Sequence, residues 1–176
     1  DNPMSFINKC KQEFTNTQGA ETTNIFSHLS KDQKVVMSYS GKTNSEMIEI
    51  KGSQQSMYDH YHIPESDKIG LVSHLTIASK IGEDGMVYSP FLVCNKGEVI
   101  SKEPVYLNQR QREGKYIAPW DADLSKDKVR CYFKNDIVEV NRELVDLKEY
   151  TVLQNVSVAT SMIEVPQFSE GKRLLM

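Results

Sequence analysis

The sequence predicts a mainly β fold, an antiparallel β-sandwich or partly open barrel with an N-terminal amphipathic helix. Closely spaced apolar stretches separated by turn sequences run from residue 33 to residue 166. In the last stretch, alternate residues fall on one side of an extended chain, as in a half-buried strand: Val156, Val158, Thr160 and Met162. Apolar residues near the N-terminus recur at helical spacing instead. Many short strands at this spacing are typical of sandwiches and barrels.

Residues 1–32 are predicted to form an N-terminal helical segment. Asn2 suits the cap of a first helix and Pro3 its first turn. The apolar side of that helix carries Phe6, Ile7, Cys10 and Phe14. Thr22 or Thr23 is expected to cap a second, shorter helix, whose apolar side carries Ile25, Phe26 and Leu29.

Residues 33–166 are predicted to form the β-rich core domain, followed by a mobile tail at 167–176. Asp84-Gly85 lies between two apolar runs and predicts a hairpin, and Asn95-Lys96-Gly97 predicts a second tight turn. The segment 141–150 fits a short helix or a further strand. Strands are expected at 35–37, 47–50, 71–79, 86–94, 98–100, 129–133, 137–140 and 150–165.

Length and composition are those of an ordinary globular protein. The 176 residues suit one domain that buries a core without disulfides or metals. Apolar residues make up 39 % and charged residues 26 %, which argues against disorder. The formal charge of -3 and the interleaving of acids with Lys and Arg argue against nucleic-acid binding. The most basic stretch, 108–115, is therefore interpreted as a solvated loop.

Targeting signals and cysteines bear on the compartment. No apolar run reaches the ~20 residues that span a bilayer, so no transmembrane segment is predicted. A cytoplasmic location is expected, in the host cell if the protein is viral. Met4 suits a natural start, and the alternative is an exported fragment whose leader has been removed. The odd set of Cys10, Cys94 and Cys131 is no disulfide framework. Cys94 and Cys131 are expected in the core, bridged if the protein is exported.

His60 and His62 form the one cluster of potential metal ligands. In an extended segment both side chains project from the same face, and Glu65 or the more distant His74 would complete a zinc or iron site. The spacing resembles the His-x-His…Glu motif of cupins, which are β-barrel proteins. Cupins place the glutamate further on and add a downstream histidine, whereas no histidine follows His74. Surface histidines near a turn explain the pair equally well.

No catalytic residues and no cofactor are predicted. The sequence has no Gly-x-Ser-x-Gly elbow and no phosphate-binding glycine loop. Asp121, Asp123 and Asp127 resemble the start of a calcium loop. However, Lys126 and Tyr132 stand where that loop needs Gly and Glu.

Three aromatic residues are candidates for protein–protein contacts. Trp120 lies in a polar stretch, where it either plugs one end of the sheets, the preferred interpretation, or anchors a contact. Phe6 and Phe14, on the apolar side of the N-terminal helix, are expected to pack on a neighbouring subunit or on the core.

A non-enzymatic structural or interaction protein is the predicted functional class. A β-rich frame without an assembled catalytic site and apolar strand edges such as 86–94 favour it. The protein is therefore expected to self-associate as an assembly, matrix, capsid or scaffold protein, or to bind a protein partner. One alternative is a metal-binding β-barrel protein, with or without enzymatic activity, that uses His60 and His62. Another is an exported β-sandwich adhesin or pilus component.

Overall fold

The structure is a computed structural model of the chain and describes residues 4, 7, 8, 11, 19, 23–37, 49–64, 69–165 and 168. Its helices in the continuous ranges are α2 (Ile25–Asp32), α3 (Gln109–Arg112) and α4 (Val158–Ser161), with the 3-10 helices η2 (Gly52–Gln54), η3 (Arg142–Leu144) and η4 (Val152–Gln154). Its strands are β1 (Lys34–Val36), β2 (Val72–His74), β3 (Lys80–Ile81), β4 (Val87–Asn95), β5 (Glu98–Val99), β6 (Val105–Asn108), β7 (Ile117–Ala118), β8 (Lys128–Phe133), β9 (Asp136–Asn141) and β10 (Leu147–Glu149).

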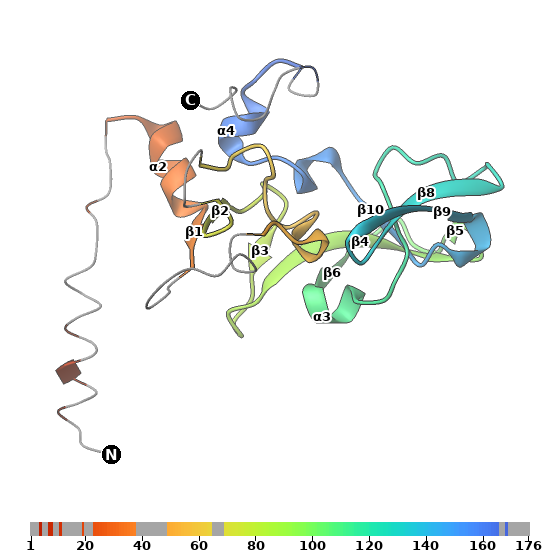
Figure 1. Cartoon of the computed structure of the whole chain (residues 1–176), viewed down its shortest axis with the longest axis horizontal. Helices are drawn as coiled ribbons and strands as arrows, with labels where there is room; N and C mark the ends of the chain where they lie inside the picture. The colour runs from red at the N-terminus through yellow and green to blue at the C-terminus, as the bar shows by residue number, and fades with distance from the viewer. Residues whose placement is uncertain are drawn as a thin grey trace.

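One open, mixed sheet built on the long strand β4 forms most of the fold (Figure 1). Strands β3, β5, β6 and β10 pair with β4 in antiparallel fashion, and β10 continues the sheet to β7, β8 and β9. The β7–β10 pair is parallel, with Leu147 opposite Ile117. Pairing ends at β3 and β9, so the sheet is not a closed barrel. The predicted mainly β fold is confirmed, with one parallel pair among the expected antiparallel ones.

A smaller unit of β1, β2, α2 and α4 lies at one end of the molecule (Figure 1). Strands β1 and β2 pair in antiparallel fashion, with Lys34 opposite His74. Gln33 joins the segment after β2 to α4. Its carbonyl accepts a hydrogen bond from the Leu75 N–H at 2.8 Å. Its side-chain Oε1 also accepts from the Val158 N–H, at the start of α4, at 3.1 Å. One polar residue therefore ties the small sheet to α4.

The hydrophobic core of the large sheet consists of two clusters on its opposite faces. Side chains alternate along a strand, so adjacent residues Ile117 and Ala118 of β7 belong to different clusters. One cluster contains Phe91, Ile117 and Leu147. The other contains Cys94, Ala118, Val129, Cys131 and Val145. Cys94 and Cys131 are buried free thiols, as expected of core residues, and burial raises the pKa of Cys131 to about 11.

The strand predicted at 150–165 is wrong, because the chain there forms η4 and α4. Side-chain oxygens cap both turns: Thr151 accepts from the Leu153 N–H at 3.3 Å, and Ser157 accepts from the Thr160 N–H at 3.5 Å. These local hydrogen bonds replace the strand pairing that the apolar alternation favoured. The segment 141–150 contains both expected alternatives, η3 and β10, whereas the strand expected at 71–79 is limited to β2.

The β4–β5 turn and the β8–β9 hairpin agree with the sequence predictions. The second N-terminal helix is also confirmed as α2, although Asn24 caps it by accepting from the Phe26 N–H at 2.9 Å. Met4, Ile7, Asn8 and Lys11 are helical, while Phe6, Cys10 and Phe14 lie outside the described residues, as does most of the strand expected at 47–50. Among the described residues, no helix combines the length and apolar character needed to cross a bilayer.

Candidate functional site

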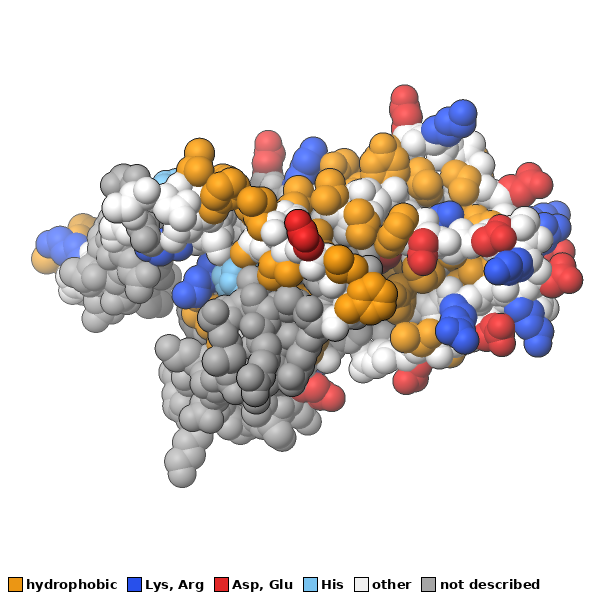
Figure 2. Space-filling model, turned by 90° about the horizontal axis from the view of Figure 1, so that it is seen from above, with side chains coloured by type: hydrophobic (Ala, Val, Ile, Leu, Met, Phe, Trp, Pro, Cys, Tyr) orange, Lys and Arg blue, Asp and Glu red, His pale blue; other side chains and the backbone are white. Residues whose placement is uncertain are grey.

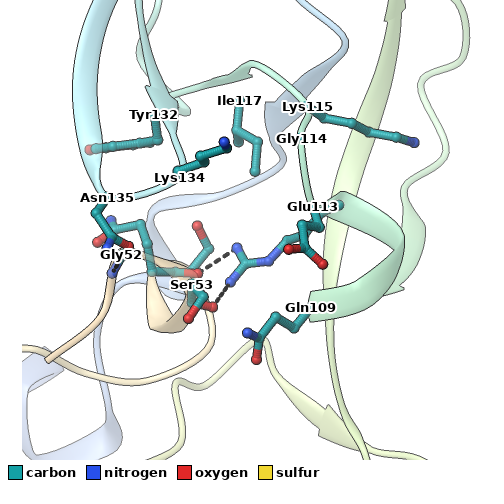
Figure 3. Close-up of a pocket in the computed structure, with 13 residues that line it drawn as sticks. Gly52, Ser53, Gln109, Glu113, Gly114, Lys115, Ile117, Tyr132, Lys134 and Asn135 are labelled. Carbon is teal, nitrogen blue, oxygen red and sulfur yellow. Dashed lines mark hydrogen bonds between the residues drawn. The ribbon is translucent and has the colours of Figure 1, made fainter. Parts of the chain in front are cut away.

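A cavity of about 290 Å³ opens between segments that are far apart in the sequence (Figure 3). Loop 52–56 and the β8–β9 turn form one side of it, and α3 with the turn that follows forms the other. Ile117 of β7 and Tyr132 of β8 supply its apolar surface. Lys134 points into the cavity, whereas Lys115 extends away from it (Figure 3). The cavity therefore combines an aromatic ring with cationic groups.

Arg112 forms the structural base of this cavity. The side chain is only 5 % exposed. Its guanidinium donates to the carbonyl of Gln55 at 2.6 Å and to the carbonyl of Ser53. Burial lowers the pKa of Arg112 to about 10, although nearby Glu149 acts in the opposite direction. The side chain remains a cation at neutral pH and holds loop 52–56 against α3. The interpretation of 108–115 as a solvated loop is therefore wrong at Arg112.

Glu149 lies beneath the same loop and is almost fully buried. Its carboxylate accepts hydrogen bonds from the Ser56 hydroxyl, from the Asn155 side-chain amide at 3.1 Å and from the Trp120 N–H at 3.3 Å. Burial raises the pKa of Glu149, and these hydrogen bonds offset only part of that effect. The buried carboxylate connects the loop, β10 and η4, so it acts as a structural link.

Gly52 lies too close to the β8–β9 turn for any larger residue. Its N–H donates to the Asn135 side chain at 3.1 Å. A Cβ atom at this position would collide with the Lys134 carbonyl oxygen and lie 2.7 Å from the Asn135 Cα atom. Since both atoms belong to the backbone, neither can move away as a flexible side chain would.

The Gly52→Ala substitution is expected to lower the free energy of unfolding by about 2 kcal/mol, because loop 52–56 must separate from the β8–β9 turn. Urea denaturation followed by circular dichroism measures this change. Gly19→Ala is the matched control, since a Cβ there meets no atom within 4 Å. Equal stability of the two variants would contradict the close approach.

Of the predicted metal ligands, His60 and His62 lie among the described residues. The His62 ring stacks on His74, with ring centroids 3.5 Å apart and planes 2° from parallel. The buried Nε2 of His60 has no hydrogen-bond partner among the described residues. Within the same ranges, no three His, Cys, Asp or Glu side chains are placed to hold a metal ion. Glu65 lies outside the described residues, so a site that uses it stays a prediction.

Asp59 is the polar centre of the smaller unit. Oδ2 accepts from the Ser157 N–H at 2.7 Å and from the Thr160 hydroxyl at 2.5 Å. Oδ1 accepts from the N–H groups of Tyr61 at 2.7 Å and His62 at 3.2 Å. This carboxylate therefore joins the histidine-containing loop to α4.

Of the predicted contact residues, only Trp120 is described. The Trp120 side chain is 46 % exposed, which does not fit a plug between sheets. Its role in a protein contact stays a prediction, as do the roles of Phe6 and Phe14.

The pattern of the sequence did not reveal Asp59, Arg112 or Glu149. Each lies in a stretch with many polar residues, where the hydrophobic pattern does not show which polar side chains are buried. The one available signal was Asn108, which caps α3: Oδ1 accepts from the Gln111 N–H at 3.0 Å, and the Gln111 side chain accepts from the Asn108 N–H at the same distance. Recognition of that capping box would have placed Arg112 on a helix.

Comparison with known proteins gives a consistent set of relatives, although no family model matches. A protein from Ehrlichia canis is 34% identical over 64% of this chain and 9% of its own length. One from Bigelowiella natans is 32% identical over 64% of this chain and 11% of its own length. One from Oltmannsiellopsis viridis is 27% identical over 97% of this chain and 13% of its own length. Each is a DNA-directed RNA polymerase subunit beta. The chain spans about a tenth of the length of these curated relatives.

These relatives overturn the predicted functional class. A non-enzymatic, self-associating assembly or viral structural protein is wrong, because the similar proteins are subunits of an enzyme. The metal-binding and adhesin alternatives are not supported either. The argument against nucleic acid is also wrong, since the enzyme is named for both DNA and RNA. The region that the chain matches is about a tenth of each relative, and so short a region of an enzyme subunit need not carry a catalytic motif. A net charge over the whole chain also does not describe one local surface.

Proposed function

We propose that this chain contributes one segment of a DNA-directed RNA polymerase β subunit and works within that enzyme. The observation that carries the proposal is the extent of the similarity, which reaches 97% of the chain in the Oltmannsiellopsis viridis protein. Other polymerase subunits and nucleic acid are the partners that this function requires. The proposal places the chain in the compartment that holds the template DNA, which agrees with the predicted cytoplasmic location if that DNA is in the cytoplasm.

The surface of the chain supports a role as part of a larger assembly. Hydrophobic side chains gather over the middle of the face in Figure 2. Ile77, Val152 and Leu153 are exposed and lie in neighbouring segments, since the Ile77 N–H donates to the Val156 carbonyl at 3.0 Å and the Ala78 N–H to the Leu153 carbonyl at 3.2 Å. Contiguous apolar surface of this kind indicates a protein contact. The much greater length of the relatives supplies the occupant: the remainder of a polymerase β subunit.

Purification of the complete chain from its native cell tests the proposal. An affinity-tagged chain is expected to co-purify with proteins similar to the rest of the polymerase. The purified assembly is expected to incorporate ribonucleotides in a manner that depends on a DNA template. Mass spectrometry identifies the proteins, and a radiolabelled-nucleotide assay measures the activity. A chain that purifies only with copies of itself, and without activity, would refute the proposal.

Replacement of both Val152 and Leu153 by serine is expected to reduce the co-purified polymerase proteins about tenfold, because the exposed side chains then lose their apolar contact. The yield of polymerase proteins relative to tagged chain is the measurement. The matched control is Ile137→Ser on β9, another exposed apolar residue, which lies outside this surface. An unchanged yield for the double variant would place the contact elsewhere.

A further inference from the structure

The cavity beside Arg112 has features that neither its structural role nor the proposed assembly explains. It lies between α3, the β8–β9 turn and loop 52–56, and it includes the basic stretch that the sequence singled out. Its volume of about 290 Å³ corresponds to roughly ten water molecules. That space is suitable for one flat ring together with an attached sugar, and too small for a folded peptide element.

The charge of the cavity favours an anionic ligand. Arg112 and Lys134 line it, against the single acid Glu113, while the side chain of Lys115 extends away from the space (Figure 3). The amino group of Lys134 points into the space (Figure 3). Arg112 is committed to two carbonyls, so Lys134 is the cation best placed to meet a ligand from solvent. Lysine neutralises phosphate as a point charge and does not require a fixed geometry.

The wall of the cavity favours a ligand with an aromatic face. Tyr132 is half-buried, lines the cavity and packs against the apolar cluster that contains Ile117. Burial raises the pKa of Tyr132, so its hydroxyl remains protonated at neutral pH. Gln109 and Asn135 add amide groups that can contact the edge of a base. An aromatic platform combined with a basic rim is the usual arrangement for binding single-stranded nucleic acid without sequence preference.

We propose that this cavity binds one nucleotide of a single-stranded nucleic acid, with the base against Tyr132 and a phosphate near Lys134. This inference rests on the proposed function, because a polymerase segment works beside nucleic acid. It extends that function by assigning a binding site to named residues.

The test uses the purified complete chain and fluorescein-labelled hexauridylate, followed by fluorescence anisotropy over a range of salt concentrations. We expect a Kd in the micromolar range that rises with salt. Tyr132→Ala is expected to raise the Kd about tenfold by removing the stacking platform. Tyr132→Phe keeps the ring and should bind as the unchanged chain does. Lys134→Gln should weaken binding several-fold and reduce the salt slope by about 1.

Matched controls separate the cavity from the general surface. Tyr106→Ala removes an exposed tyrosine from β6, and Lys102→Gln removes an exposed lysine outside the cavity, so neither should change the Kd. Circular dichroism confirms that each variant is folded, and Lys134→Gln keeps the test valid if Tyr132→Ala does not fold.

Three results would overturn the inference. The first is that the unchanged chain does not bind the hexauridylate. The second is that the cavity variants and the control variants lose affinity equally. The third is that a labelled DNA duplex binds as tightly as the single strand, with a Kd that Tyr132→Ala does not change. Because the assay uses the chain alone, such results reject the cavity as a binding site and do not affect the co-purification test of the proposed function.

Discussion

Replacement of Asp59 by alanine is expected to lower the free energy of unfolding by about 4 kcal/mol, a large part of the stability of a typical domain. The carboxylate is 1 % exposed and accepts four hydrogen bonds, one from Thr160 of α4 and one from Ser157, the residue that caps α4. Alanine leaves the Ser157 and Tyr61 N–H groups without this acceptor in a buried environment. The effect is expected to be local at first, so the contact of α4 with the rest of the smaller unit should be lost before the large sheet unfolds.

Urea denaturation gives the free energy, and amide hydrogen exchange locates the loss. Asp59→Asn keeps the shape and one acceptor, so about half of the destabilisation is expected. The exposed Asp121 provides the control, and Asp121→Ala should leave stability unchanged. Uniform loss of protection over both sheets would contradict a local role.

The same carboxylate makes stability depend on pH. Burial raises the pKa of Asp59, but hydrogen bonds, above all from Thr160, outweigh burial and lower it. The folded state therefore binds the proton more weakly than the unfolded chain. The contribution of Asp59 is complete above the unfolded pKa of about 3.9 and is lost as the pH falls through the folded value.

Burial, followed by the charge of His74, lowers the pKa of His62 to about 4. The contribution of His62 to stability is complete above the unfolded pKa of about 6.5 and is lost as the pH falls to about 4. This range lies above the one for Asp59. Denaturation curves should thus show two successive losses. His62→Gln should reduce the upper one and not abolish it, because burial also lowers the pKa values of His60 and His74.

The sequence predicted the parts of the fold that depend on local signals. Strand β4 is a largely apolar run bounded by turn sequences, and the β8–β9 hairpin has alternating residues on both sides of Lys134-Asn135. The segment 150–165 has the same alternation but forms short helices. Thr151 and Ser157 decide this by capping turns of three or four residues, which are too short to show a helical period.

The candidate site was much less predictable, because its contacts join distant segments. Arg112 binds carbonyls 57 and 59 positions away, and Asp59 binds Thr160 across 101 positions. A single sequence contains no local pattern for such pairs. The histidines show the same limit: spacing paired His60 with His62, whereas the fold stacks His62 on His74 of β2. Composition failed for a related reason, since folding brings Lys134 of the β8–β9 turn to the cavity beside Arg112.

Replacement of Arg112 by alanine is expected to lower the free energy of unfolding by about 3 kcal/mol. It would remove the donors to the Ser53 and Gln55 carbonyls and leave buried Glu149 without its nearby cation. The neighbouring residue gives a sharp control, because Arg110 lies on the same helix and is exposed. Arg110→Ala should therefore leave stability unchanged in the same urea denaturation assay.

Arg112→Lys separates charge from geometry. Lysine keeps the positive charge near Glu149, but its single ammonium cannot reproduce the planar fork that reaches two carbonyls. If the fork holds loop 52–56, Arg112→Lys should lose most of the stability that Arg112→Ala loses, and exchange protection should fall in that loop. If charge compensation of Glu149 dominates, lysine should restore stability almost completely. Since the guanidinium contacts two carbonyls and the Glu149 carboxylate is already satisfied by Ser56 and Asn155, we expect the first result.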